Sequence, residues 1–187
     1  MKILYFFKEQ QKLMYQWQRF HIFEELSIHN VDVCVFNPLI YSNSDEANEC
    51  LVKELKNNRY DLFMTPHNHE DLYVETLWRV KEVGIPTLLI CFDNLIVPFS
   101  HKKISKHFDL VWLTSIETKY LFDAWGANSI FMPYAANPYL MKPVFTDEIA
   151  TVAFVGTPYG SRVNMLNTLL KSNIKVDLFS NLGNTIL

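Results

Sequence analysis

Short apolar runs alternate along the chain with segments in which apolar residues recur every three or four positions. The runs predict strands buried on both faces of a parallel sheet, and the recurring positions predict helices with one apolar face. The predicted strands are 3–7, 31–36, 61–65, 87–92, 110–114 and 129–134. The predicted helices are 14–28, 44–57, 70–83 and 115–125, with a short helix or loop at 98–107. This alternation predicts a doubly wound, Rossmann-like α/β sheet of parallel strands.

Individual residues refine the helices of this pattern. The first helix is expected to pack into the core through Trp17, Phe20, Phe23 and Leu26. Ser44 and Ser115 are expected to cap the helices that they open, because a serine hydroxyl accepts a hydrogen bond from the first backbone N–H groups. Gly84 is expected to end the third helix.

The pattern restarts late in the chain. A strand is predicted from Thr151 to Gly156, a helix at 161–171 and another strand at 175–179. We therefore divide the chain into a first lobe at 1–136, a linker at 137–150 and a second unit at 151–187. A domain usually needs about 100–200 residues. The second unit is thus expected to be the first βαβ of an incomplete lobe, in a fragment of a longer protein or a truncated gene product.

Composition excludes several classes of protein. Hydrophobic residues make up 49% of the chain, as in a globular protein, and the net charge of −3 gives no reason to expect nucleic-acid binding. No apolar run approaches the roughly 18 residues of a membrane span. Three cysteines without a CxxC motif fit a reducing, cytoplasmic setting. The basic segment 101–107 is either a solvated helix face or a contact for phosphate or anionic lipid, which leaves peripheral membrane contact open.

Ligands of a doubly wound sheet bind beyond the carboxyl ends of the strands. The first strand is not followed by GxGxxG, so a dinucleotide cofactor is not expected there. The third strand is followed by His67, His69 and Glu70, which we interpret as substrate contacts. The alternatives are capping of the next helix by Asn68 or the neighbouring acids, and a metal site that lacks an obvious third ligand.

Two further strand ends carry polar residues. Asp93 follows the fourth strand directly, where a carboxylate can accept a proton from a hydroxyl group, and Asn94 lies beside it. The alternative is a simple turn, which an Asp-Asn pair favours. Ser115 follows the fifth strand, where helix capping comes first and substrate contact second.

The late strand–helix turn carries the sharpest candidate chemistry. It reads Gly156-Thr157-Pro-Tyr159-Gly-Ser-Arg162. Glycine allows close approach of the backbone to a ligand, a helix N-terminus favours an anion, and Arg162 adds a cation suited to phosphate. The alternative is an ordinary turn with a surface arginine.

Several stretches together resemble one family. They are Tyr60–Leu62, Cys91–Asn94, Phe108–Val111 with Thr114–Ser115, Gly126–Ile130 leading to Met132–Pro138, and Val152–Thr157 with Arg162. Through them the chain resembles the two-lobed glycosyltransferases of GT-B fold, most closely the CgeB-like (spore-maturation protein) glycosyltransferases. The resemblance covers most of residues 60–180 and is weak over the first 50.

The resemblance implies an acceptor-binding first lobe and a second lobe that binds a nucleotide-sugar. It implies transfer of a sugar to a glycan or protein acceptor, with the nucleotide-sugar as donor and no metal or other cofactor. The catalytic candidate is Asp93, and the substrate-binding candidates are His67, His69, Glu70, Asn94, Ser115 and Asn137. The candidates for the donor phosphates are Gly156, Thr157, Tyr159 and Arg162.

The chain also departs from the family. The Asp-Asp-Pro-like end of the fourth strand reads Asp93-Asn94-Leu95 here, so the catalytic role rests on Asp93 alone. The part of the second lobe that is expected to bind base and ribose is absent from this sequence, so we expect the chain alone to be inactive. Two alternatives stay open: a non-catalytic binding remnant of such an enzyme, and a metal-dependent hydrolase that uses His67, His69 and Asp93.

Overall fold

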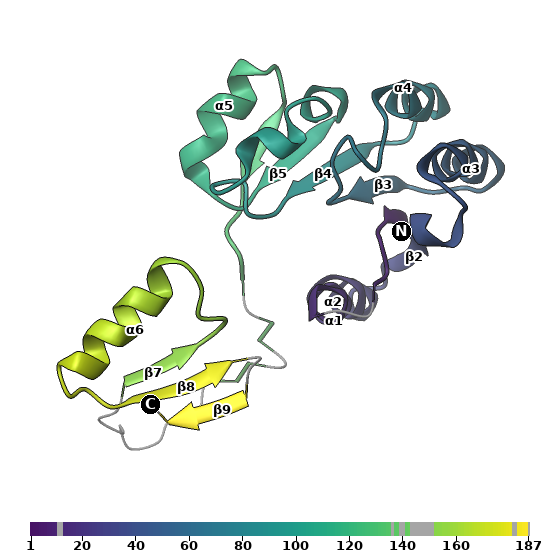
Figure 1. Ribbon diagram of the computed structural model, residues 1–187. Helices are drawn as coiled ribbons and strands as arrows, with labels where there is room; N and C mark the ends of the chain where they lie inside the picture. The colour runs from purple at the N-terminus through teal and green to yellow at the C-terminus, as the bar shows by residue number, and fades with distance from the viewer. Residues whose placement is uncertain (11–12, 136, 139–140, 143–151, 181–182, 187) are drawn as a thin grey trace. The chain divides into compact units, whose positions relative to one another are not determined.

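A computed structural model of the protein describes residues 1–10, 13–135, 137–138, 141–142, 152–180 and 183–186 (Figure 1). The chain forms two compact units, Met1–Met141 and Lys142–Leu187. The predicted linker at 137–150 lies largely outside the described residues.

The first unit is built on a six-stranded sheet with the order β2-β1-β3-β4-β5-β6. All neighbouring strands pair in parallel; Leu4, for example, lies opposite Cys34 on one side and Phe63 on the other. The strands are β1 (Lys2–Phe6), β2 (Asp32–Phe36), β3 (Leu62–Thr65), β4 (Thr87–Cys91), β5 (Leu110–Leu113) and β6 (Ser129–Phe131). The predicted α/β, Rossmann-like sheet is confirmed.

Helices or helical turns connect these strands. The helices are α1 (Leu13–Gln18), continued through the π-helical turn η1 (Arg19–Phe23) into α2 (Glu24–Ile28), then α3 (Ser44–Asn57), α4 (Val74–Val83) and α5 (Lys119–Ala124). Short 3-10 turns are η2 (Pro38–Ile40), η3 (Pro98–His101), η4 (Ser105–His107) and η5 (Ile116–Thr118). The segment between β4 and β5, predicted as a short helix or loop, thus holds two such turns.

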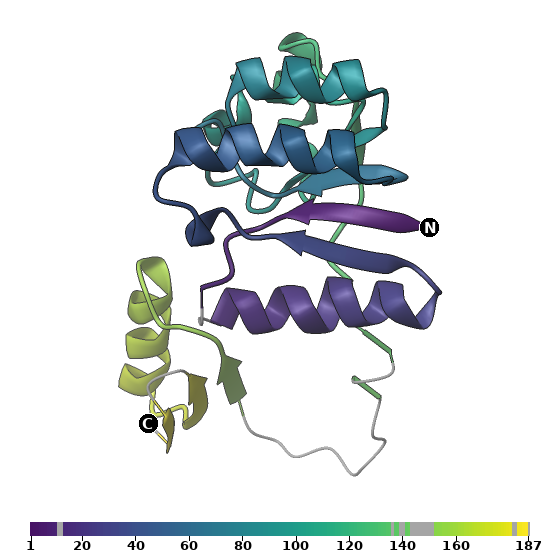
Figure 2. The ribbon, with the colours of Figure 1, turned by 90° about the vertical axis from the view of Figure 1, so that its right-hand side faces the viewer.

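The strand order determines which face of the sheet each helix covers. Parallel crossovers are right-handed, so the direction of movement across the sheet fixes the face. The step from β1 to β2 moves one way, and all later steps move the other way. Accordingly, α1–α2 lie on one face and α3, α4 and α5 on the opposite face (Figures 1 and 2).

Alternate residues of each strand serve the two faces, as the pleat requires. In β1, Leu4 and Phe6 join the core beneath α3, α4 and α5, whereas Ile3 and Tyr5 join the core beneath α1–α2. All four are almost completely buried. A strand with both faces buried explains why β1 reads as a continuous apolar run rather than an alternating one.

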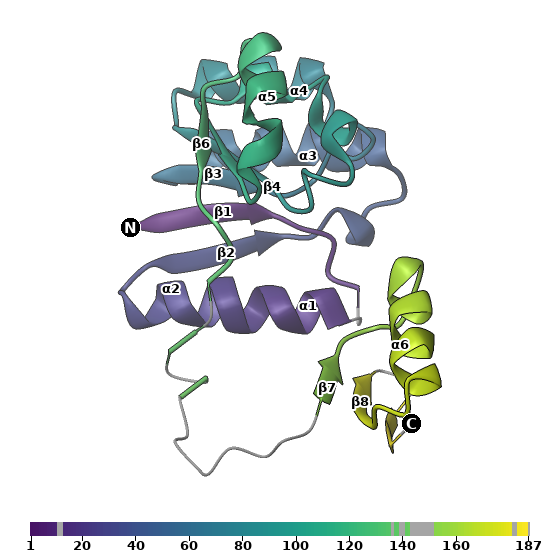
Figure 3. The ribbon, with the colours of Figure 1, turned by 90° about the vertical axis from the view of Figure 1, so that its left-hand side faces the viewer.

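The face under α1–α2 is only partly covered by helices. An apolar cavity of about 370 Å³ opens beside α2, and its lining includes Leu88, Ile90, Trp112 and Ile130 of β4, β5 and β6. The chain that leaves β6 runs down this side of the unit (Figure 3). It is fixed there by the indole Nε1 of Trp112, which donates to the carbonyl oxygen of Met132 at 2.7 Å.

The first helical segment differs from the prediction at one position. Phe20, expected in the core, is 45% exposed, whereas Ile22 and Phe23 are buried. The cause is the π-helical turn η1, because such a turn holds more residues than an α-helical turn and shifts the apolar face. Trp17 and Leu26 pack against the core as predicted.

Three predicted helix starts also change. The cap of α3 is Asn43, whose Oδ1 accepts from Glu46 N at 2.9 Å, and Ser44 is already helical. The helix predicted from residue 70 begins only at Val74, because Asp71 and Leu72 donate their N–H groups to the carbonyl of Asn68 in a turn. The side chain of Ser115 makes no capping hydrogen bond at η5.

The second unit is a small sheet with one helix. It consists of β7 (Val152–Val155), α6 (Ser161–Lys171), β8 (Val176–Ser180) and β9 (Gly183–Ile186). The strand order is β7-β8-β9, with β7 and β8 parallel and β9 antiparallel to β8. Leu166 of α6 packs on Val176 and Leu178 of β8. The strand–helix–strand unit is as expected, and β9 is a strand that the sequence pattern did not predict.

A helix that crosses a bilayer must combine sufficient length with apolar character. None of the helices in the described ranges combines both properties.

The fold generates a prediction about a buried hydrogen bond. The hydroxyl of Tyr5 donates to Gln18 Oε1 at 2.7 Å, and both residues are about 99% buried or more. Gln18→Ala leaves the hydroxyl without a partner, which costs about 1–3 kcal/mol. Urea unfolding followed by tryptophan fluorescence measures the loss in the first unit, which contains all four tryptophans of the chain. Gln16→Ala, at an exposed position of the same helix, is the control, and equal effects of the two substitutions would contradict the prediction.

Candidate active site

The carboxyl ends of β1, β3, β4 and β5 meet at one edge of the first unit, because these strands are parallel neighbours. The segments that follow them carry most of the predicted site residues. The structure separates these residues into some that face an open cavity and others that hold the edge together.

The cavity at this edge lies beside Asp93. It has a volume of about 460 Å³ and is lined by Trp17, His21, Phe92, Asp93, Tyr134, Ala135 and Met141. Asp93 is exposed and is the only carboxylate among the described residues that line the cavity. A cavity of this size with largely apolar walls and a few polar groups is typical of a small-molecule site.

Aromatic rings form the walls of the cavity. Phe92 and Tyr134 stack nearly parallel, with ring centroids 6.0 Å apart. Trp17 meets Phe92 edge-on at 5.3 Å and Tyr134 at 6.1 Å. The three rings come from α1, the end of β4 and the chain after β6, so the sheet and the first helix jointly define the walls.

The backbone at Asp93 turns its side chain toward this cavity. Its φ of 52° is left-handed, a conformation that aspartate tolerates better than most residues. The hydroxyl of Tyr134 lies 3.3 Å from the backbone N of Asp93 and 3.4 Å from Oδ1, accepting from the first and donating to the second. The turn alternative and the functional interpretation are compatible, because the carbonyl of Asp93 accepts from Ile96 and Val97 in a turn that presents the carboxylate.

Asn94, the next residue, faces the opposite way and is completely buried. Its Oδ1 accepts from the backbone N–H groups of Thr114 and Ser115 at 2.9 and 3.0 Å, and its amide donates to the carbonyl of Ser115 at 2.8 Å. The Thr118 hydroxyl accepts the second amide hydrogen. These hydrogen bonds join the ends of β4 and β5 and hold Asn94 outside the cavity lining, and substrate contact by Asn94 stays a prediction. Ser115 belongs to the same joint through its backbone.

His67 likewise acts inside the protein. The backbone N–H of Lys8 donates to its Nε2 at 3.0 Å, so Nδ1 carries the hydrogen and donates to Asp71 Oδ2 at 2.8 Å. The ammonium of Lys8 pairs with the other oxygen of Asp71. His67 thus ties the end of β1 to the loop after β3, and neither ring nitrogen is available to a substrate.

The charge of Asp71 depends on these partners. Burial by itself raises the pKa of Asp71, but the hydrogen bonds from His67 and Lys8 outweigh burial and hold the pKa below its usual value. The carboxylate is therefore ionised at neutral pH and stabilises the edge of the sheet as an ion.

The other two polar residues after β3 lie apart from the cavity lining. His69 is half-buried, with Nδ1 at 3.4 Å from the carbonyl oxygen of Ser100, and the side chain of Glu70 is exposed. Within the described ranges, no three His, Cys, Asp or Glu side chains lie close enough to hold a metal ion. This weighs against the hydrolase alternative built on His67, His69 and Asp93.

Asn137 contacts α2 rather than the cavity. It is 8% exposed, and its Nδ2 donates to Glu25 Oε2 at 2.7 Å. This contact holds the chain after β6 against the helical layer. The structure thus gives Asn137 a bracing contact with α2, and its substrate contact stays a prediction.

In the second unit, the predicted phosphate-binding residues come together at one turn. Gly156 ends β7 with a φ of 141°, which favours glycine. Arg162, in the first turn of α6, donates from Nη1 to the carbonyl of Thr157 at 3.2 Å and lies 4.6 Å above the ring of Tyr159. The guanidinium is therefore positioned over the turn and remains exposed.

Sequence reasoning missed part of the cavity. The pattern of apolar positions predicts Trp17 only as a core residue and gives no role to His21 or Tyr134. All three line the cavity. Tyr134 carried the best available signal, because it follows β6 at the same edge and belongs to a stretch that supports the resemblance. The contribution of Trp17 depends on packing between α1 and β4, for which the sequence offers no signal.

Comparison with known proteins gives no family assignment. No protein-family model matches the sequence, and no curated protein matches it. The strand order establishes the class as a Rossmann-like α/β protein.

The Asp71 network generates a prediction about pH. A carboxyl whose pKa is lowered by folding adds stability above its unfolded pKa of about 3.9, and that stability is lost as the pH falls below this value. Asp71→Asn should therefore lower the free energy of unfolding at pH 7 by about 1–3 kcal/mol. The deficit should shrink at pH 3. Urea unfolding at both pH values checks this, with Glu70→Gln as an exposed control in the same loop; a deficit equal at both pH values would contradict the assignment.

Proposed function

We propose that the first unit binds a sugar hydroxyl beside Asp93 and serves as the acceptor lobe of a glycosyltransferase of GT-B type. The observation that carries this proposal is the exposed carboxylate in a cavity walled by Trp17, Phe92 and Tyr134. Aromatic faces pack against the C–H faces of sugar rings, and a carboxylate accepts hydrogen bonds from sugar hydroxyls. The resemblance to the CgeB-like enzymes adds support from a separate line of reasoning.

Asp93 is the proposed general base. In the transfer step, a hydroxyl oxygen of the acceptor attacks the anomeric carbon of the donor sugar, the bond to the diphosphate breaks, and the hydroxyl proton passes to the carboxylate. The Tyr134 hydroxyl, 3.4 Å from Oδ1, orients the carboxylate and leaves its other oxygen open to the acceptor.

The second unit is proposed to contact the donor diphosphate. The turn at Gly156 and Thr157, the N-terminus of α6 and the guanidinium of Arg162 form a concentration of positive potential. Such groups stabilise the negative charge that develops on a departing diphosphate.

A binding protein that retains only the acceptor function is the second candidate. It is favoured by the same cavity, which needs no second unit to hold a saccharide. Saccharide binding by the first unit without binding of any nucleoside diphosphate would support this candidate over the enzyme.

The role of Asp93 is tested with Asp93→Asn, which keeps the side-chain shape and tolerates the left-handed backbone. We expect saccharide binding, measured by saturation-transfer NMR against a panel of mono- and oligosaccharides, to weaken by about tenfold. If transfer is detected with a nucleotide-sugar panel, the rate should fall by about 10²–10⁴. Glu117→Gln, an exposed acid after β5, is the control. Saccharide binding unchanged by Asp93→Asn would remove the site from consideration.

The role of Arg162 is tested separately by calorimetric titration with UDP, GDP and ADP. We expect at least one of these diphosphates to bind, and Arg162→Ala to weaken its binding about tenfold or more through loss of a charged hydrogen-bond donor. Arg59→Ala, at an exposed arginine of the first unit, controls for net charge. Absence of any diphosphate binding would contradict the donor half of the proposal and leave the acceptor half standing.

A further inference from the structure

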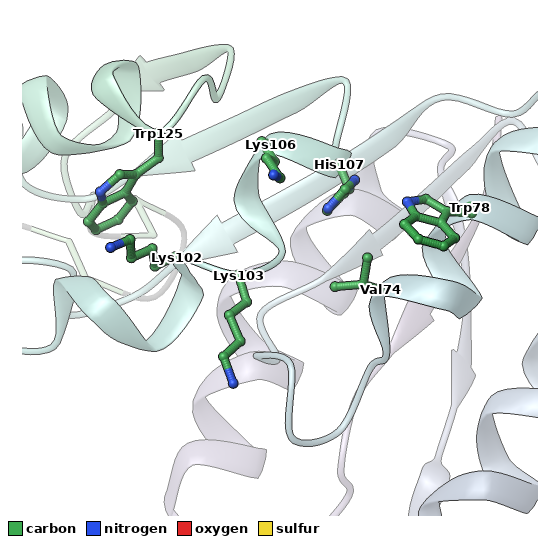
Figure 4. Close-up of a pocket in the computed structure, with 7 residues that line it drawn as sticks. All are labelled: Val74, Trp78, Lys102, Lys103, Lys106, His107 and Trp125. Carbon is green, nitrogen blue, oxygen red and sulfur yellow. The ribbon is translucent and has the colours of Figure 1, made fainter.

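A basic surface lies on the opposite side of the β4–β5 connection from the core. It consists of Lys102, Lys103 and Lys106, flanked by Trp78 and Trp125, and it encloses a depression of about 640 Å³. Figure 4 shows Trp125 with Lys102 at one end and Trp78 with His107 at the other, with Lys103 and Lys106 between them.

The lysines of this surface are exposed because residues next to them in the chain are buried and anchor the segment. His101 and Ile104 are 5% and 0% exposed, whereas Lys102, Lys103 and Lys106 are all exposed. Lys102 and Lys103 lie between the 3-10 turns η3 and η4, and Lys106 lies within η4. The lysine positions are therefore fixed by the fold.

In the part of the chain that the structure describes, no carboxylate pairs with these lysines. Among the ion pairs formed by the described residues, none includes Lys102, Lys103 or Lys106. His107, beside them, has its pKa lowered by burial and by the positive charges of Lys106 and Lys81. The surface is thus a local concentration of positive charge on a chain whose net charge is −3.

An apolar loop adjoins the basic surface. It follows β4 at Leu95–Phe99, where Ile96 is 73% exposed and Phe99 is 63% exposed, and Leu95 and Val97 are about half exposed as well. Four large apolar side chains exposed within five residues are unusual in a protein that contacts only water.

Direct contacts make the loop and the basic surface continuous. The ring of Phe99 lies 5.5 Å from that of Trp125, and the ammonium of Lys102 lies 5.7 Å from the same Trp125 ring. Directly after the loop, the carbonyl oxygen of Ser100 lies 3.4 Å from Nδ1 of His69, which helps to hold the end of the loop in place.

This combination matches one kind of partner best. Exposed aliphatic and phenyl side chains enter the acyl region of a bilayer, tryptophans settle at its interface, and lysines attract anionic headgroups. A nucleic acid would use the lysines and leave the apolar loop in water. We propose that the basic surface and the apolar loop together dock this protein on an anionic lipid bilayer.

The test is co-sedimentation of the full chain with vesicles of phosphatidylcholine alone or with 30% phosphatidylglycerol. We expect binding to the anionic vesicles and little to the neutral ones. Raising the salt concentration should weaken binding, because the lysine–headgroup attraction is screened. Glycerol phosphate at matched phosphate concentration should not compete, and effective competition would indicate a site for free phosphate and overturn the proposal.

Two sets of variants separate charge from insertion. Lys102→Gln/Lys103→Gln/Lys106→Gln should lower the vesicle partition coefficient by about a hundredfold, since each lysine near an anionic surface contributes about a factor of five. The control Lys53→Gln/Lys56→Gln/Lys175→Gln removes the same charge from other exposed positions and should have little effect. Ile96→Ser/Phe99→Ser should weaken binding at least tenfold.

A spectroscopic measurement locates the contact. Brominated acyl chains should quench the fluorescence of the wild-type chain, and Trp78→Phe should reduce that quenching, whereas Trp112→Phe, in the sheet, should not. All altered loop and lysine positions are exposed, so the circular dichroism spectrum should be unchanged. Absence of binding to anionic vesicles, or equal loss in the test and control lysine variants, would overturn the proposal.

Discussion

The handedness of parallel crossovers is the constraint on which the arrangement of this protein depends. Because β2 lies on one side of β1 and all later strands lie on the other, a single crossover covers one face and every later one covers the opposite face. The parallel pairing of the strands brings their carboxyl ends to one edge. One wall of the cavity beside Asp93 forms where Trp17 of α1 packs on Phe92 at the end of β4.

Two adjacent residues at that edge show how backbone geometry divides structure from chemistry. Asn94 is buried and joins the ends of β4 and β5, whereas Asp93 is exposed to the cavity. The left-handed φ of 52° at Asp93 makes the two side chains point in different directions. The buried hydrogen bonds of Asn94 fix the backbone next to Asp93 without occupying the carboxylate oxygens of Asp93. A base that must be held in position requires such support.

The sequence predicted the α/β class and every strand of the first unit, because continuous apolar runs report burial on both faces. It placed Asp93 at the correct edge for the same reason. It could not predict that Asp93 is exposed while Asn94 is buried. Nor could it predict that the ring nitrogens of His67 are hydrogen-bonded to Lys8 and Asp71. Both outcomes depend on contacts between residues distant in the chain. It misplaced Phe20 because a π-helical turn leaves no clear mark in the pattern of apolar positions.

The connection between β4 and β5 links the two proposals made for the first unit. Leaving β4, the chain presents Asp93 to the cavity, then the apolar loop at Leu95–Phe99, and then the lysines of the basic surface before it enters β5. Only one residue, Asn94, separates the proposed base from the proposed membrane loop, and Asn94 is immobilised by its buried hydrogen bonds. Docking of that loop on a bilayer would therefore fix the cavity close to the headgroups, where a membrane-borne acceptor has a short path to Asp93.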